Sequence, residues 1–154
     1  MDLKNIMKGI LFFYIAMYIT LALNSYGHAL CVNVSDANLR SGPGTQYEKT
    51  WEVFKYMPFK KITQKGAWYK VKDVDGDEHW IYKKLVTSKF KCAVVKKNNI
   101  NIRTGPGRNF NTTLLSPAVT YDSFKIIKAR DSWVNVVDEF GNNGWIFKQL
   151  LWIQ

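Results

Sequence analysis

Histidine is scarce in this chain of 154 residues, which contains only His28 and His79. A zinc site with several imidazole ligands is therefore excluded. Cysteine is equally scarce, because Cys31 and Cys92 are the only two. A Cys–His nucleophilic site would need one of them as a free thiol beside His79, together with an orienting group. The sequence thus predicts a protein that is not an enzyme and has no metal site and no cofactor, and we interpret His79 as a surface residue of a strand.

One group of acidic residues could form a metal site. Asp73, Asp75, Asp77 and Glu78 form a cluster of oxygen ligands of the kind that calcium prefers. However, Gly76 is the fourth residue counted from Asp73, whereas the calcium loop of helix–loop–helix sites has its glycine at the sixth place. Because Asp-Gly favours tight hairpin turns, we interpret the cluster as the solvated tip of a β-hairpin.

A long apolar run is also missing. The unbroken run Ile10 to Leu23, which contains no charge, has 14 residues, which is short of the ~20 that a membrane-spanning helix needs. Lys4 and Lys8 precede it, and the small residues Gly27 and Ala29 follow it at the spacing that signal peptidase reads. This pattern predicts a signal peptide over residues 1–29, cleaved after Ala29, with an uncleaved anchor as the alternative. We therefore expect an exported protein, periplasmic or extracellular, without a membrane span after cleavage.

The charge is far from balanced. Lysine and arginine number 22 and aspartate and glutamate 12, for a net charge of +10. Residues 31–88 carry 10 basic and 7 acidic residues, and residues 89–154 carry 10 and 4, so that their net charges are +3 and +6. Such a charge favours an anionic partner, and the second half more than the first. Export argues against nucleic acid, and the lysines could also serve solubility alone.

An internal repeat is the strongest signal in the sequence. Asn38 to Gly44 reads N-L-R-S-G-P-G, and Asn101 to Gly107 reads N-I-R-T-G-P-G, a spacing of 63. Farther on, the spacing becomes 65, which implies two extra residues around Leu114 to Val119. The matched positions at these spacings include Tyr47 and Phe110, Trp68 and Trp133, Val71 and Val136, Trp80 and Trp145, and Leu85 and Leu150. The repeat predicts two domains, residues 30–88 and residues 89–154.

Each repeat has the pattern of an all-β domain. Apolar residues alternate in Cys31 to Val34, in Trp51 to Phe54 and from Tyr69 to Asp73, and Gly, Pro, Asn and Asp separate these runs. No segment beyond residue 29 has a helical period. About five short strands in a repeat of this length predict a small barrel, which removes exposed sheet edges.

The repeated residues resemble a known family. The N-[LI]-R-[ST]-G-P-G opening, the later W-x-x-V and the closing G-x-x-x-W-I-x-K-x-L are similar to the bacterial SH3-like domain, from Cys31 to about Gln154. The first repeat departs from the second in having Glu78-His79 before Trp80, where the second has Gly144 before Trp145. The resemblance implies two tandem SH3-type barrels of five strands each, acting as binding modules for cell-wall material or envelope peptides.

The two cysteines open the two repeats. Exported proteins fold in an oxidising compartment, where a pair of cysteines usually forms a disulfide. The barrel that the resemblance implies brings its first and last strands together, so that Cys31 lies near Cys92. We favour a disulfide between them, with two buried thiols as the alternative.

Four tryptophans are the main candidates for binding. If Val71 and Ile81 face the core, strand alternation directs Trp68 and Trp80 outwards, and the same holds for Trp133 and Trp145. Exposed aromatic rings grip sugars and peptides through their flat apolar faces. The alternative is that these tryptophans close the barrel ends or fill the seam between the domains.

The Gly-Pro-Gly loops supply further candidates. Tyr47 and Phe110 could extend an aromatic patch or pack beneath the loop. Arg40 and Arg103 either bind loop carbonyls or grip the carboxylate of a wall peptide. We predict a non-enzymatic protein of the bacterial cell envelope that recognises peptidoglycan or its peptides. The alternative is an interaction or scaffold protein that docks an envelope protein, and the sequence leaves the oligomeric state open.

Overall fold

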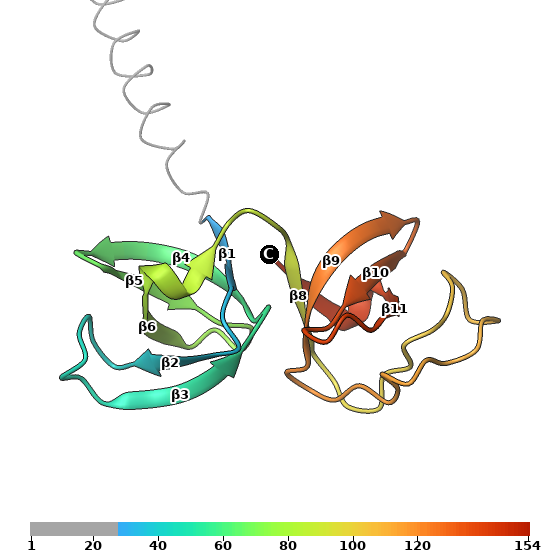
Figure 1. Ribbon diagram of the computed structural model, residues 1–154, viewed down its shortest axis with the longest axis horizontal. Coiled ribbons are helices and arrows are strands. Elements are labelled where there is room, and N and C mark those ends of the chain that lie inside the picture. The colour runs from blue at the N-terminus through green and yellow to red at the C-terminus, as the bar shows by residue number, and fades with distance from the viewer. Residues whose placement is uncertain (1–27) are drawn as a thin grey trace, which may run out of the picture.

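The computed structural model describes residues 28–154, which form two antiparallel sheets side by side (Figure 1). Most of the predicted signal peptide lies outside the described residues, and its last residue, Ala29, begins the first strand. Within residues 28–154, no helix is long and apolar enough to cross a membrane. The predicted all-β class is confirmed for the described residues, in which the only helical elements are two single turns of 3₁₀-helix, η1 (Lys83–Leu85) and η2 (Lys148–Leu150).

The first sheet has seven strands in the order β3-β2-β6-β5-β4-β1-β7. Their bounds are β1 (Ala29–Val32), β2 (Asp36–Arg40), β3 (Lys49–Phe54), β4 (Pro58–Lys65), β5 (Trp68–Lys72), β6 (Glu78–Tyr82) and β7 (Val86–Thr87). Alternation explains the core: Ala37 and Leu39 of β2 are buried, whereas Asp36 and Asn38, which alternate with them, are exposed.

The second sheet has five strands in the order β11-β10-β9-β8-β12. Their bounds are β8 (Cys92–Val95), β9 (Ser123–Arg130), β10 (Trp133–Val137), β11 (Asn143–Phe147) and β12 (Leu151–Ile153). The segment between β8 and β9, which is the counterpart of β2 and β3, forms only isolated bridges, such as Ile100 with Ala118 and Arg103 with Thr112.

The prediction of two five-stranded barrels is therefore only partly right. The first sheet has seven strands, and the strand pairing of residues 28–154 leaves both sheets open at their ends. The second half loses a hairpin because its chain carries two extra residues around Leu114 to Val119, and among them Pro117 has no amide hydrogen to donate to a ladder.

The two halves nevertheless share unusual backbone features. Tyr56 and Tyr121, which are 65 residues apart, have positive φ angles of 71° and 74°. Gly76 and Gly141, with the same spacing, have φ angles of 94° and 91° at the tips of their hairpins. These parallels agree with the repeat in the sequence, whereas a second copy of the same domain stays a prediction.

Strand β8 connects the two hydrophobic cores. Ala93 and Val95 pack into the core of the second half, whereas the side chain of Val94 between them packs into the core of the first half. Trp152, the partner of Val94 on β12, also packs against the first core. The second sheet thus covers one side of the first core, and the halves form one packed body.

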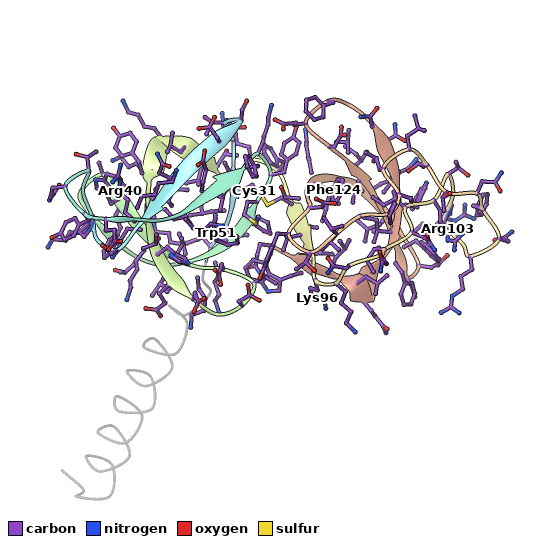
Figure 2. The ribbon with its side chains drawn as sticks, turned by 90° about the horizontal axis from the view of Figure 1, so that it is seen from below. Cys31, Arg40, Trp51, Lys96, Arg103 and Phe124 are labelled. Carbon is purple, nitrogen blue, oxygen red and sulfur yellow. A yellow bond between two sulfur atoms is a disulfide. The ribbon has the colours of Figure 1, made fainter. Side chains whose placement is uncertain are left out.

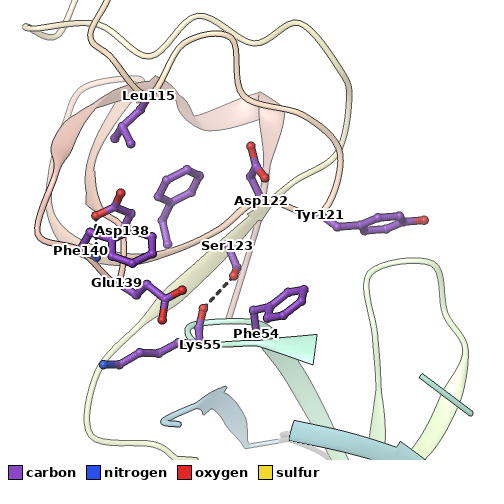
Figure 3. Close-up of a pocket in the computed structure, with 10 residues that line it drawn as sticks. Phe54, Lys55, Leu115, Tyr121, Asp122, Ser123, Asp138, Glu139 and Phe140 are labelled. Carbon is purple, nitrogen blue, oxygen red and sulfur yellow. Dashed lines mark hydrogen bonds between the residues drawn. The ribbon is translucent and has the colours of Figure 1, made fainter. Parts of the chain in front are cut away.

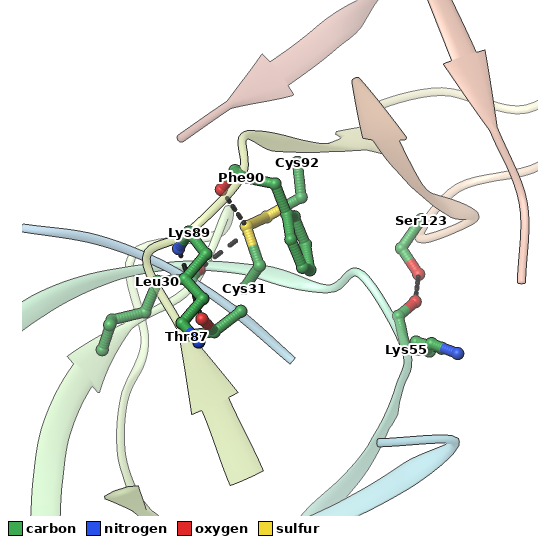
Figure 4. The surroundings of a disulfide bond; sticks show 8 residues. All are labelled: Leu30, Cys31, Lys55, Thr87, Lys89, Phe90, Cys92 and Ser123. Carbon is green, nitrogen blue, oxygen red and sulfur yellow. Dashed lines mark hydrogen bonds between the residues drawn. A yellow bond between two sulfur atoms is a disulfide. The ribbon is translucent and has the colours of Figure 1, made fainter. Parts of the chain in front are cut away.

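A disulfide joins the halves at their junction (Figure 4). Cys31 on β1 and Cys92 on β8 are both fully buried, with their Cα atoms 6.0 Å apart, and the predicted pairing is confirmed. Two further contacts lie close by: the hydroxyl of Ser123 donates to the carbonyl of Lys55 at 2.8 Å, and the rings of Tyr56 and Phe90 meet edge to face. These links hold the two sheets in one arrangement.

Candidate functional site

The outer face of β5 and β6 carries the first pair of candidate tryptophans. Val71 on β5 and Ile81 on β6 are fully buried in the core, so their neighbours along each strand face away from it. Trp68 is paired with Tyr82 across the two strands, and their ring centroids are 5.6 Å apart. The pairing therefore places aromatic rings side by side on the outside of the sheet.

A row of side chains crosses this face at Trp80. Trp80 pairs with Arg40 of β2 on one side and with Lys70 of β5 on the other. Lys70 forms an ion pair with Glu78, and its hydrogen bond to that carboxylate lowers the pKa of Glu78. The indole of Trp80 thus lies between two cationic side chains on a half-exposed surface.

The second half repeats this arrangement on β10 and β11. Trp145 pairs with Arg103 on one side and with Asn135 on the other, and Lys128 follows Asn135 in the same row. The ammonium group of Lys128 lies 5.7 Å from the centre of the Trp145 ring, within reach of a cation–π interaction. Each half therefore presents an aromatic–cationic outer face, which we define by Arg40, Lys70, Trp68, Trp80 and Tyr82 in the first half and by Arg103, Lys128, Trp133, Trp145 and Phe147 in the second.

The four tryptophans differ in their exposure. Trp68, Trp80 and Trp133 are half-buried, and none of the three belongs to a hydrophobic core. Trp145 is only 9% exposed, so the expectation of an open ring at this position is wrong. Strand alternation predicts the face on which a side chain lies, but it does not predict how far neighbouring groups cover that side chain.

The Gly-Pro-Gly loops pack in the same way in both halves. Arg40 donates from Nη1 to the carbonyls of Tyr47 at 2.7 Å and Thr45 at 3.2 Å, and Arg103 donates to the carbonyl of Phe110 at 2.7 Å. These are the contacts of an arginine that holds a loop, and a role in binding stays a prediction. Arg40 and Arg103 lie toward opposite ends of the molecule (Figure 2).

An aromatic ring lies directly over a glycine in each loop. A Cβ atom at Gly42 would lie 2.3 Å from the ring of Tyr47, and one at Gly105 would lie 2.4 Å from the ring of Phe110. Both rings remain 40% exposed. The loop glycines therefore let Tyr47 and Phe110 pack against the backbone while one side of each ring faces solvent.

His79 is not the surface residue that we expected. Its side chain is only 13% exposed, and it is held between Thr50 Oγ1, 3.0 Å from Nδ1, and Asp73 Oδ2, 3.3 Å from Nε2. Thr50 is the extra residue of a bulge in β3, because Lys49 and Trp51 pair with consecutive residues of β2. Thr50 is 29 residues away in the sequence, so no local signal could have revealed this partner.

The acidic cluster is divided among separate partners. Asp73 is buried, and its Oδ1 accepts the backbone N–H groups of Asp75 and Asp77, which fixes the hairpin. Glu78 pairs with Lys70 on the outer face, and Asp75 accepts a hydrogen bond from Tyr121. Within residues 28–154, no group of three or more His, Cys, Asp or Glu side chains is placed to hold a metal ion.

A family model matches most of the first half. Residues 33–87, from the chain before β2 to the end of β7, match the family model of the bacterial SH3 domain. The match contains Arg40, Tyr47, Trp68 and Trp80, that is, the candidate residues of the first half.

One curated relative covers both halves. The chain is 22% identical over 125 residues to a putative N-acetylmuramoyl-L-alanine amidase of Bacillus subtilis. The similarity covers 75% of this chain and 24% of the relative, so the chain spans about a quarter of the length of that protein.

Solved structures with some similarity were also found. An NlpC/P60 family protein from Bacillus cereus is 12% identical with a TM-score of 0.38, and the match covers 82% of this chain and 56% of that one. NlpC1 from Trichomonas vaginalis is 12% identical with a TM-score of 0.37, over 83% and 47% of the two chains. The CBD of endolysin LysPBC5 is 18% identical with a TM-score of 0.31, over 85% and 97%.

Proposed function

We propose that this chain is an exported, non-enzymatic binding protein that contacts cell-wall glycan or peptide through the aromatic–cationic outer faces of two SH3-like units. The observation that carries the proposal is the row on the first face, in which the half-buried Trp80 lies between Arg40 and Lys70. In the second half, the half-buried Trp133 is the tryptophan that a ligand can reach, because Trp145 is covered. The flat face of an indole binds a sugar ring or an apolar side chain, and the flanking cations attract carboxylates.

The comparisons support a role at the cell wall. The family matched by residues 33–87 is bacterial, and the name of the curated relative describes an enzyme that acts on muramoyl-alanine bonds. We assign binding to this chain because residues 33–87 match the bacterial SH3 domain. The scarcity of histidine and the involvement of both cysteines in a disulfide agree with this assignment.

Export is part of the proposal. The buried disulfide is the kind of bond that persists in oxidising compartments. Cleavage after Ala29 would remove the first residue of β1 and leave Leu30, which is buried, as the new N-terminus. N-terminal sequencing of the protein recovered from the envelope or the medium tests this step, and an intact Met1 would contradict it.

Retention on purified wall material tests the binding function. We expect the Trp68→Ala, Trp80→Ala and Trp133→Ala variants to lose affinity by about tenfold each, as is usual when an aromatic anchor is truncated. Ile62 and Ile127 provide matched controls, because they are exposed apolar residues of bulges in β4 and β9 and are not among the residues that define these faces. Absence of wild-type retention at low salt, or equal losses in Ile62→Ala and Ile127→Ala, would contradict the proposal.

A scaffold role is the second candidate. Phe54 and Phe140 are exposed apolar residues that line one cleft at the junction of the halves, as a surface for a partner protein would require. A protein partner captured equally well by the Trp80→Ala variant and in the absence of wall material would favour this role over wall binding.

A further inference from the structure

A cleft of about 290 Å³ lies at the junction of the two halves (Figure 3). The first half contributes the end of β3, with Phe54 and Lys55, and the second half contributes the remaining walls. The hydrogen bond from Ser123 to the carbonyl of Lys55 connects the two halves within the cleft. The cleft therefore exists only while the two sheets keep their relative positions.

Exposed aromatic rings flank the opening of this cleft. Phe140 is 83% exposed and Phe54 is 58% exposed. In the first half, the position equivalent to Phe140 is Asp75, which has a polar side chain bonded to Tyr121. An open phenylalanine at a hairpin tip contributes nothing to the core, and exposed apolar groups that are rimmed by polar residues mark sites of interaction.

The second half, which forms most of the cleft, is positively charged overall, whereas the residues that it contributes to the cleft are acidic. Residues 89–154 contain four acidic and ten basic residues. Three of the four acidic residues, Asp122, Asp138 and Glu139, line the cleft, and none of the ten basic residues of this half does. Lys55 of the first half is the single basic residue of the lining, so that acidic residues outnumber it three to one. A positively charged half that gathers its carboxylates in one apolar cleft favours a cationic occupant there.

The three carboxylates differ in what they already bind. Asp138 accepts hydrogen bonds from the backbone of its own hairpin and from the side chain of Asn142, and Asp122 accepts one from the backbone of Val119. Glu139 makes no ion pair with the described residues, and its carboxylate points into the space between the halves (Figure 3). Glu139 is therefore the carboxylate that can meet an incoming cation.

We propose that this cleft is a second binding site, separate from the aromatic–cationic outer faces, for a peptide side chain that ends in a primary ammonium group. The methylene groups of the side chain lie between Phe54 and Phe140, and the ammonium group reaches Glu139 with the aromatic faces beside it. A volume near 290 Å³ accommodates one such side chain with part of its backbone. The proposal does not depend on wall binding by the tryptophans.

Calorimetric titration of the full chain tests this site with two probes. The first probe is N-acetyl-Ala-Ala-Lys-amide, and the second is the same peptide with an acetylated lysine Nε. We expect acetylation to weaken binding at least tenfold, since it removes the charge that Glu139 meets. Equal binding of the two peptides, or no binding of the first at millimolar concentration, would overturn the proposal.

Two variants with one control locate the site. Glu139→Gln and Phe140→Ala alter exposed side chains, and we expect each to weaken the lysine peptide at least fivefold while the unfolding midpoint stays that of the wild type. Asp131→Asn is the matched control, because Asp131 is the one acidic residue of the second half outside the cleft and asparagine tolerates its φ of 51°. An equal loss in Asp131→Asn and Glu139→Gln would indicate attraction to net charge alone and would overturn the proposal. Wall retention by Glu139→Gln reports on the outer faces separately.

Discussion

The phenol of Tyr121 donates a hydrogen bond of 2.8 Å to Asp75, and these two residues belong to different halves of the molecule. The ring of Tyr121 also meets Trp51 of the first half edge to face, with centroids 5.3 Å apart. The first half is thus attached to the second by a polar contact at the tip of the β5–β6 hairpin and by an aromatic contact at β3. The hydrogen bond to Asp75 raises the pKa of Tyr121 above its usual range.

This contact predicts a loss of stability at high pH. The neutral phenol is the form that donates to Asp75, and for this reason the pKa of Tyr121 is raised in the folded protein. The stability that this hydrogen bond contributes is complete below the usual tyrosine pKa of about 10. It is lost as the pH rises through the higher pKa of the folded state. Tyr121→Phe removes the contribution, so its unfolding midpoint falls less than that of the wild type between pH 9 and pH 12. Tyr47→Phe is the control, because the second half has Phe110 at that position. Identical pH profiles for wild type and Tyr121→Phe would contradict this prediction.

The disulfide predicts a large effect on stability. Cys31 and Cys92 are separated by 61 residues, and closing a loop of that length contributes about 4 kcal/mol in the chain-entropy model. We expect the double variant Cys31→Ser, Cys92→Ser to lose about this much free energy of unfolding in urea titrations. Reductant should lower the stability of the wild type to that of the double variant, and a wild type insensitive to reductant after unfolding and refolding would contradict the prediction.

Gly144 is predicted to tolerate no side chain. A Cβ atom there would lie 2.4 Å from Cγ2 of Ile102, which is fully buried, and 3.2 Å from the carbonyl oxygen of Arg103. Gly144→Ala should therefore cost about 1–3 kcal/mol in the free energy of unfolding. Gly66→Ala is a useful comparison, because its Cβ would meet nothing within 4 Å and only the φ of 57° opposes it. A Gly144→Ala variant as stable as the wild type would show that the second half repacks freely.

His79 is predicted to stabilise the hairpin formed by β5 and β6. Asp73 is buried with an exposed fraction of 4%, and His79 is the side chain that meets its Oδ2. His79→Ala leaves that buried oxygen without this partner and should cost about 1–3 kcal/mol. Thr50 is exposed, and its hydroxyl contacts the other ring nitrogen of His79. Thr50→Val removes this hydroxyl and should cost less free energy of unfolding than His79→Ala. The order of the two losses in denaturant titrations checks the assignment, and the reverse order would refute it.

Local patterns predicted much of the fold from the sequence. The alternation around Val71 and Ile81 placed two strands and the side of the sheet that faces the core, and the Asp-Gly pair at residues 75–76 placed a hairpin. These features depend on neighbours within a few residues, so the sequence contains them directly. The disulfide was predicted as well, with help from the family resemblance.

Features that depend on contacts between distant segments could not be predicted. The seven-stranded first sheet includes the short pair of β1 with β7, and the missing hairpin of the second half results from an insertion whose path the repeat pattern does not give. The burial of Trp145 and the contact of His79 with Thr50 both depend on residues from other segments of the chain. The cleft at the junction has the same origin, because its walls come from three segments far apart in the chain.

The position of Val94 limits how the chain can be divided. A fragment that ends where the first sheet ends, at Thr87, lacks a valine and a tryptophan that cover its own core. Such a fragment would expose an apolar surface that promotes association with other molecules, and it would therefore be poorly suited to fusion proteins. If the two halves arose from duplication of one ancestral gene segment, they have since become mutually dependent, and evolution can now exchange them only as a pair.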